Sequence, residues 1–170
     1  MVRPKVAHSV SSRAQDGGFT LVEIAIVLAI IGIAAALAGP NLMTMYARYE
    51  LYQTTTSLYQ ALMLARSAAI TRNTVITATL SNLPSGQGQV TFNAAVTAEP
   101  FPLTVGFVPP LPAQPIGFTA RGLSTTPQTT QTVQLQSLRD PNLIYTISLA
   151  PSGKVTWCNQ AVNPCLVQSG

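Results

Sequence analysis

The sequence predicts an α+β protein in which one long N-terminal helix packs on a C-terminal antiparallel β-sheet domain. Three observations lead to this prediction. Residues 24–47 carry no charged side chain, and a helical apolar stripe continues from there to about residue 72. After residue 73, short β-prone runs alternate with turn signals to the end of the 170-residue chain.

The composition argues against an enzyme. Only 8% of the residues are charged, against about 25% in an average globular protein. Five carboxylates and one histidine, His8, leave little material for acid–base catalysis. No nucleophile, zinc or phosphate-loop motif is present. We therefore expect no catalytic residue, no bound metal and no cofactor.

The uncharged stretch has the length of a membrane anchor. As a helix, residues 19–43 would cover about 37 Å, which exceeds a hydrocarbon core of about 30 Å. Arg3, Lys5 and Arg13 precede it, so the positive-inside rule places the N-terminus in the cytoplasm. Glu23 lies just inside the apolar run, and a carboxylate in lipid requires a partner or access to water.

Residues 17–23 read GGFTLVE. With the basic leader before them and the apolar helix behind, they resemble the processing site of type IV prepilins and type II secretion pseudopilins. The resemblance implies that a prepilin peptidase removes the leader, residues 1–18, by cutting between Gly18 and Phe19. It also implies N-methylation of Phe19 and pairing of Glu23 with the free amine of a neighbouring subunit, a pair that is strong at low dielectric.

Two further positions match this family. Gly32 and Pro40 stand where family filaments loosen or kink, and a proline inside a helix removes one hydrogen bond. An ordinary secretory signal is the alternative: residues 36–38 read ALA, a signal-peptidase site that would release a soluble exported protein starting near Gly39. That alternative leaves the GFTLVE string unexplained.

The helix is expected to continue well beyond the membrane, as one element from Phe19 to Arg72. Residues 19–45 form its transmembrane and filament-core segment, apolar on all sides, and residues 46–73 form an amphipathic segment. No proline interrupts residues 41–73, and Asn73 is a suitable C-terminal stop. The buried stripe should contain Leu51, Thr55, Leu58, Leu62, Ala65 and Ala69.

Residues 74–170 are expected to form a β-rich exported domain. Strands are predicted at residues 75–80, 89–93, 103–108, 116–119, 132–138, 143–149 and 154–157. The fifth and sixth of these runs, residues 132–138 and 143–149, are predicted to form a hairpin whose first strand turns Val133, Leu135 and Ser137 to the core. The segment 100–115 holds six prolines and is expected to be a surface loop with a short strand inside.

Two motifs in the last third of the chain indicate a more specific resemblance within this family. Residues 116–122 read IGFTARG and residues 149–155 read LAPSGKV, which look like the corresponding turns of GspH/FimT-type minor pilins. DNA-binding members of that family carry a late Gly-Arg-x-Arg motif, which here reads Gly-Lys-Val-Thr at residues 153–156. Arg121, Arg139 and Lys154 could still form a weak DNA contact, although solvated turn residues are the simpler interpretation.

Cys158 and Cys165 are the only cysteines. An exported domain meets an oxidising compartment, so we expect them to form a disulfide.

Together these observations predict a minor pilin or pseudopilin of the pilin fold. It would be incorporated into a type IV pilus or a type II secretion pseudopilus, in a tip or initiation complex. The expected location is the bacterial inner membrane, single-pass, with the C-terminal domain periplasmic or extracellular. The expected partners are the prepilin peptidase/methyltransferase, other pilin subunits and inner-membrane lipid, with DNA weakly supported.

Overall fold

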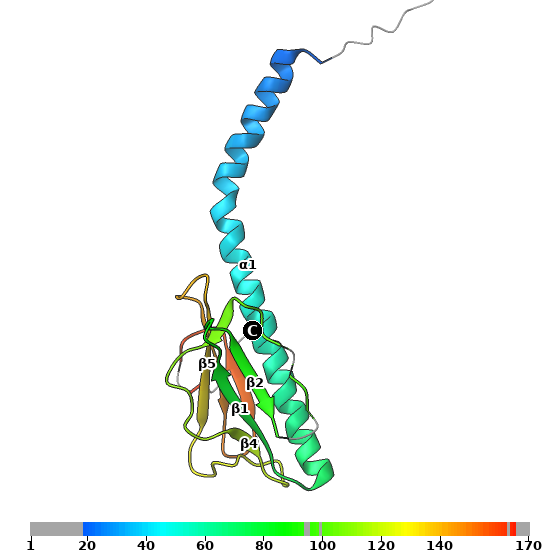
Figure 1. Cartoon of the computed structure of the whole chain (residues 1–170), viewed down its shortest axis with the longest axis vertical. Helices are drawn as coiled ribbons and strands as arrows, with labels where there is room; N and C mark the ends of the chain where they lie inside the picture. Colours follow the sequence, from blue (N-terminus) through cyan, green and yellow to red (C-terminus); the bar gives the residue numbers. More distant parts are fainter. Residues whose placement is uncertain (1–18, 94–95, 99, 163, 166–170) are drawn as a thin grey trace, which may run out of the picture. The chain divides into compact units, whose positions relative to one another are not determined.

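The computed structural model describes residues 19–93, 96–98, 100–162 and 164–165, without the side chains of residues 37–41. Its one helix, α1, runs from Leu21 to Arg72, as Figure 1 shows. The helix predicted from Phe19 to Arg72 is therefore confirmed apart from its first two residues. The chain divides into two compact units, Met1–Gly39 and Pro40–Gly170. The second unit is called the body here.

The amphipathic part of α1 supplies one wall of the core. All six residues of the expected stripe are buried, with exposed fractions no higher than 2% at Leu51, Leu58 and Leu62. The helix ends in a Schellman cap, because the Asn73 N–H donates to the Ile70 carbonyl and the Thr74 N–H to the Ala69 carbonyl. Asn73 adopts the left-handed conformation, φ 51°, that this cap requires.

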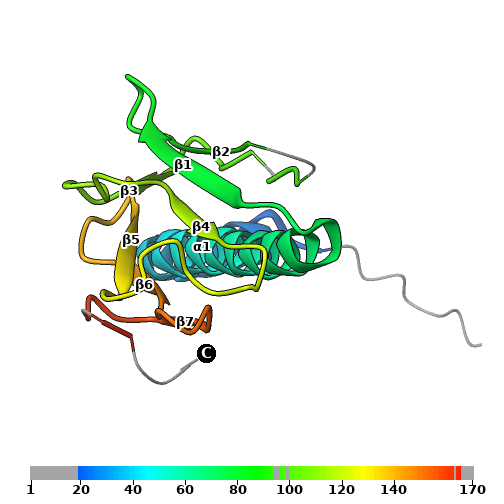
Figure 2. The ribbon, with the colours of Figure 1, turned by 90° about the horizontal axis from the view of Figure 1, so that it is seen from below.

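Seven strands follow, close to the seven predicted runs. They are β1 (Ile76–Asn82), β2 (Gly88–Phe92), β3 (Val105–Phe107), β4 (Ile116–Phe118), β5 (Gln131–Ser137), β6 (Ile144–Leu149) and β7 (Val155–Cys158). They form two antiparallel sheets, with the orders β2-β1-β4 and β3-β5-β6-β7. Figure 2 shows both sets of strands beside the helix.

The predicted hairpin and its inward face are confirmed. Strands β5 and β6 pair antiparallel, with Val133 opposite Ile147 and Leu135 opposite Tyr145. Val133, Leu135 and Ser137 are all buried. Alternation with period two therefore identified the core face of this strand from sequence.

The proline-rich segment contains the expected short strand, β3, and differs from the expected surface loop in its first half, which is partly buried. Phe101, Val105 and Phe107 from this segment are all buried, and the rings of Phe101 and Phe107 lie 5.2 Å apart. The short strand β3 also links the two sheets. Asn82 at the end of β1 donates from its amide to the Phe107 carbonyl at 2.8 Å and accepts from the Phe107 N–H at 2.9 Å.

Candidate functional site

The start of α1 has a side-chain cap that places Glu23. The Glu23 N–H donates to the Thr20 hydroxyl at 3.2 Å, and the Ile24 N–H donates to the Thr20 carbonyl at 3.2 Å. Thr20 is thus the N-cap and Glu23 is the third helical residue, the positions of a Thr-x-x-Glu capping pair. The carboxylate in the first turn also complements the positive end of the helix dipole. This cap was not predicted from the sequence, although residues 20–23, TLVE, have the Thr-x-x-Glu spacing.

The other residues expected around the processing site are only partly described. Gly18 and the leader lie outside the described residues. Phe19 is 78% exposed, and Glu23 is exposed. Gly32 and Pro40 both lie within α1; a Cβ at Gly32 would meet no atom within 4 Å, and the side chain of Pro40 lies outside the described ones. The roles assigned to these positions stay predictions.

The first turns of α1 expose an unusually dense apolar surface. The large hydrophobic side chains between residues 21 and 33 are each between 46% and 86% exposed. A contiguous apolar surface of this kind requires lipid or other protein to cover it. Among the described residues, none of the helices combines the length and the hydropathy that crossing a bilayer demands.

The body has two ends along the helix. At the end where the helix enters, called the proximal end, Glu50 connects α1 to the strands. Its carboxylate accepts from the Thr104 hydroxyl at 2.8 Å and lies 3.4 Å from Arg139 Nε. The Arg139 guanidinium also lies over the ring of Tyr46, 5.4 Å from its centroid.

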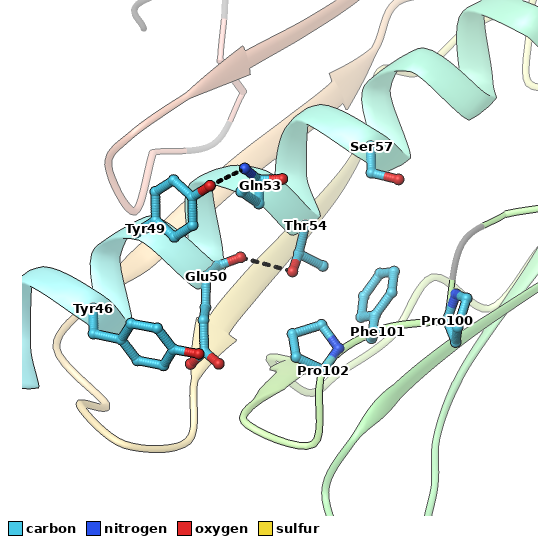
Figure 3. Close-up of a pocket in the computed structure, with 9 residues that line it drawn as sticks. All are labelled: Tyr46, Tyr49, Glu50, Gln53, Thr54, Ser57, Pro100, Phe101 and Pro102. Atoms are coloured by element: carbon cyan, nitrogen blue, oxygen red, sulfur yellow. Dashed lines mark hydrogen bonds between the residues drawn. The ribbon is translucent and has the colours of Figure 1, made fainter.

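An open pocket of about 300 Å³ adjoins Glu50 at this proximal end. Figure 3 shows the residues 100–102 facing the helix across it, with the side chains of Tyr46 and Glu50 on the same side of α1. The other lining residues are Tyr49, Gln53, Thr54 and Ser57. The pocket has aromatic and proline walls and a carboxylate that is already paired, so its chemistry favours packing contacts over catalysis.

At the opposite end, called the distal end, Arg66 joins α1 to two turns. Its Nε donates to the Gly122 carbonyl at 2.9 Å and its Nη2 to the Ser152 carbonyl at 3.5 Å. Gly122 and Gly153 adopt φ values of 74° and 77°, which favour glycine. A Cβ on Gly153 would collide with the Gly122 carbonyl oxygen. The two sequence motifs that contain these glycines, residues 116–122 and 149–155, therefore meet in space.

The three cations proposed for DNA contact do not all lie at the same end of the body. Arg121 and Lys154 are exposed in the two turns that meet at Arg66. Arg139 instead pairs with Glu50, which lies 16 residues before Arg66 on α1, or about 24 Å along the helix. The structure therefore brings Arg121 and Lys154 together and places Arg139 at the other end of the body.

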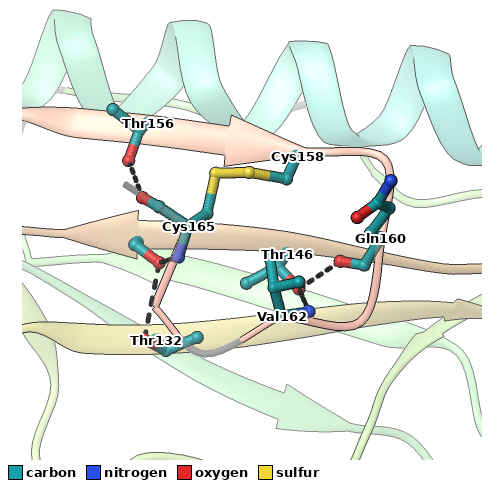
Figure 4. Close-up of a disulfide and its surroundings, with 8 residues drawn as sticks. Thr132, Thr146, Thr156, Cys158, Gln160, Val162 and Cys165 are labelled. Carbon is teal, nitrogen blue, oxygen red and sulfur yellow. Dashed lines mark hydrogen bonds between the residues drawn. A yellow bond between two sulfur atoms is a disulfide. The ribbon is translucent and has the colours of Figure 1, made fainter. Parts of the chain in front are cut away.

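The expected disulfide is present between Cys158 and Cys165. Figure 4 shows how the loop that it closes covers a row of hydroxyl groups on β5, β6 and β7. The Thr156 hydroxyl donates to the Cys165 carbonyl, and the Cys165 N–H donates to Ser148 Oγ at 2.8 Å. The Thr146 hydroxyl donates to the Gln160 carbonyl at 2.7 Å. These buried hydroxyls are thus satisfied by backbone of the closed loop.

Three aromatic side chains pack where β6 and β7 meet the helix. The Trp157 ring lies 6.0 Å from the stacked ring of Tyr145 and 5.6 Å from the edge-on ring of Tyr52. Burial raises the pKa of the Tyr145 hydroxyl above its ordinary value of 10, while the charge of Arg48 opposes that rise. Among the described residues no group of three or more metal-ligating side chains occurs.

Comparison with known proteins gives one family model and two structural likenesses. The model described as the prokaryotic N-terminal methylation motif matches residues 13–39. The fold is similar to two crystal structures of the type IV minor pilin FimU of Pseudomonas aeruginosa. The first has 19% identity over 69% of this chain and 96% of that chain, with a TM-score of 0.49. The second has 18% identity over 68% and 99%, with a TM-score of 0.45.

No curated protein matches this sequence. The matched residues begin at Arg13 and include the GFTLVE string and the first part of α1. It implies a membrane-anchored N-terminus. The chain thus carries a prokaryotic N-terminal methylation motif, ahead of an antiparallel sheet domain packed on the long helix.

Proposed function

We propose that this protein is a minor pilin or pseudopilin, a structural subunit that joins a filament through its N-terminal helix. The observation that carries the proposal is the match of residues 13–39 to the methylation motif. The exposed apolar side chains of the first helical turns support it, because they need lipid before assembly and neighbouring helices after it.

In this proposal a prepilin peptidase cuts between Gly18 and Phe19, and the new amine of Phe19 is methylated. Thr20 then stands directly after the new N-terminus, and the helix begins one residue later. The Glu23 carboxylate is exposed at the helix start. It is therefore accessible to the amine of another subunit, and their charges attract strongly once both are removed from water.

The N-terminus of the mature protein tests the processing step. We expect N-terminal sequencing and mass spectrometry of the membrane-extracted protein to give methylated Phe19. A protein that keeps its first 18 residues, or one that starts near Gly39, would refute the proposal. The second result would instead support the ordinary secretory signal.

Glu23→Gln tests the assembly step. We expect membrane insertion to remain and filament incorporation to fall by about tenfold or more, since leaving an amine without its partner costs more than about 1.4 kcal/mol. Glu50→Gln is the matched control, because Glu50 is already paired within the body. Equal incorporation of the Glu23→Gln variant and the wild type would remove the assigned role of Glu23.

DNA binding is a second candidate, favoured by the meeting of the two turns at Arg66. The side chains of Arg121 and Lys154 are exposed there, and Arg66 and Arg72 lie on the last turns of the same helix. The described carboxylates of the body, Glu50 and Asp140, both lie at the proximal end. The distal end therefore presents positive charge to a phosphate backbone.

A gel-shift series on the full chain in detergent tests this candidate. The Arg121→Ala/Lys154→Ala double variant should lose most DNA affinity and lower the slope of log affinity against log salt by about 1.5–2. Arg139→Ala, at the proximal end, should leave both unchanged. An equal loss in both variants would show nonspecific attraction to the whole protein and would reject the distal site.

A further inference from the structure

The helix residues at the proximal end of the body directly follow the uncharged stretch of the anchor. Counted from Glu23, residues 24–43 comprise 20 uncharged residues, which as helix cover about 30 Å, the thickness of the hydrocarbon core. Residues 44–47 then fall in the headgroup layer, and Arg48 is the first charged residue after Glu23. This count rests on the membrane anchorage in the proposed function.

Two turns of the body lie beside these helix residues. Arg139 and Asp140, which follow β5, line one small pocket together with Met43, Thr44 and Ala47 of the helix. The turn before β3 lies beside them, because the Leu138 N–H donates to the Thr104 carbonyl at 2.7 Å. Both turns therefore stand next to helix residues that belong to the headgroup layer.

These turns expose leucines. Leu103 is 72% exposed and Leu138 is 42% exposed. The pairing of Val105 with Ser137 in the β3–β5 ladder, continued by two residues, sets Leu103 opposite Arg139. The β1–β2 turn adds Leu83, 39% exposed, and its Gly86 lies against the side chain of Leu138. Leu83, Leu103 and Leu138 are called the proximal leucines.

The surroundings of the proximal leucines suit a lipid surface. Tyr46 and Tyr49 are more than half exposed at the same proximal end, around the pocket that adjoins Glu50, and tyrosines are enriched at the headgroup level. Arg139 and Asp140 contribute opposite charges, so the turn carries no net charge and needs no anionic lipid. The exposed Leu42, Met43 and Met45 add apolar surface on the helix at this end of the body.

We propose that, before assembly, the proximal leucines insert into the headgroup layer of the bilayer that holds the helix. The body then has a second membrane contact besides its anchor. This contact limits the directions in which the body can tilt, and it must be released when the subunit leaves the membrane for a filament. The occupant of the leucine surface is therefore lipid in the anchored subunit.

Tryptophan fluorescence of the full chain in vesicles of neutral, acyl-brominated phosphatidylcholine tests this contact. The native Trp157 is 4% exposed and provides a constant background, measured in the wild type. In Leu103→Trp we expect the added indole to lose roughly half of its emission, because an interfacial indole reaches the brominated chains. The same loss is expected when anionic lipid is included.

Leu123→Trp is the matched control, since Leu123 is 45% exposed in the distal turn that holds Gly122. Its added indole should not be quenched. Val27→Trp, within the anchor, should be strongly quenched. An unquenched Leu103→Trp beside a quenched Val27→Trp overturns the second contact and leaves the proposed function intact.

The remaining outcomes would each overturn either the proximal lipid contact or the anchored function on which it rests. An unquenched Val27→Trp shows that the anchor itself is absent, which refutes the anchored function. Equal quenching at Leu103→Trp and Leu123→Trp means that the body lies on its side, which overturns the proximal contact. A blue-shifted but unquenched Leu103→Trp indole means that a second copy covers the leucines, which overturns the assignment to lipid. The near-ultraviolet circular dichroism of Trp157 verifies folding in every variant.

Discussion

The proximal and distal ends of the body are fastened to the same helix by different chemistry. At the proximal end, Glu50 meets Arg139 and Thr104 through side chains, and 43% of the Arg139 side chain is exposed. At the distal end, Arg66 donates to backbone carbonyls of two turns that close on each other. A half-exposed ion pair contributes little in water, whereas backbone packing tolerates little change.

This difference between the two ends indicates where substitutions in the body should be tolerated. The distal turns need glycine because both glycines have positive φ, and because a Cβ would meet the Gly122 carbonyl at Gly153 and the Ile70 side chain at Gly122. In the proximal β1–β2 turn, a Cβ on Gly86 would meet only the side chain of Leu138, and the leucines of the proximal turns are exposed. We therefore expect the distal end to govern the stability of the body and the proximal end to govern its contacts with lipid.

A glycine at each end provides the largest expected contrast. Gly153→Ala should lower the free energy of unfolding by about 2–4 kcal/mol, because it combines an unfavourable φ with a collision against the Gly122 carbonyl. Gly86→Ala, at the proximal end, has a similar φ but would meet only the flexible Leu138 side chain at 3.2 Å, so about 1 kcal/mol is expected. Thermal unfolding of the full chain in detergent measures both, and equal losses would contradict the comparison.

The two arginines give a contrast of intermediate size. Arg66→Met keeps the apolar stem and removes the donors to the Gly122 and Ser152 carbonyls, which should cost about 1.5–3 kcal/mol. Arg139→Met removes an ion pair whose arginine side chain is 43% exposed, while Glu50 keeps its hydrogen bond from Thr104, and should cost about 0–1 kcal/mol. Chemical denaturation monitored by Trp157 fluorescence compares the two. A larger loss for Arg139→Met would reverse the ranking of the two ends.

Added salt is expected to change stability least. It distinguishes the Glu50–Arg139 ion pair from the hydrogen bonds of Arg66 to backbone carbonyls. Glu50→Gln should destabilise the body by less than about 1 kcal/mol at low salt, and 1 M NaCl should abolish most of that difference, because screening already weakens the pair in the wild type. The loss caused by Arg66→Met should persist at 1 M NaCl, since its acceptors are uncharged carbonyls. Unfolding midpoints at the two salt concentrations provide the measurement. A salt-independent Glu50→Gln effect would show that Glu50 acts through Thr104 alone.

Much of the fold could be predicted because its signals are local. The period of the apolar residues identified α1 and its stripe, and alternation identified β5 with Val133 and Leu135 inside. The methylation motif is a contiguous string, so it was legible without a structure. The short strand in the proline-rich segment was predicted, but the burial of Phe101 and Phe107 was not, because the six prolines are typical of surface loops and only long-range packing brings the two rings into the core.

By itself, the sequence determined the anchor-like helix with Glu23 at its start, the positions of the strands along the chain and the two cysteines that form the disulfide. These features depend on neighbours within a few residues, or on two cysteines alone in an oxidising compartment. Only the tertiary structure decided that the strands divide into two sheets, that Arg66 closes the turns of Gly122 and Gly153 on each other, and that Arg139 pairs with Glu50 instead of joining Arg121 and Lys154. Those partners are tens of residues apart, and no local spacing in the chain specifies which of them meet.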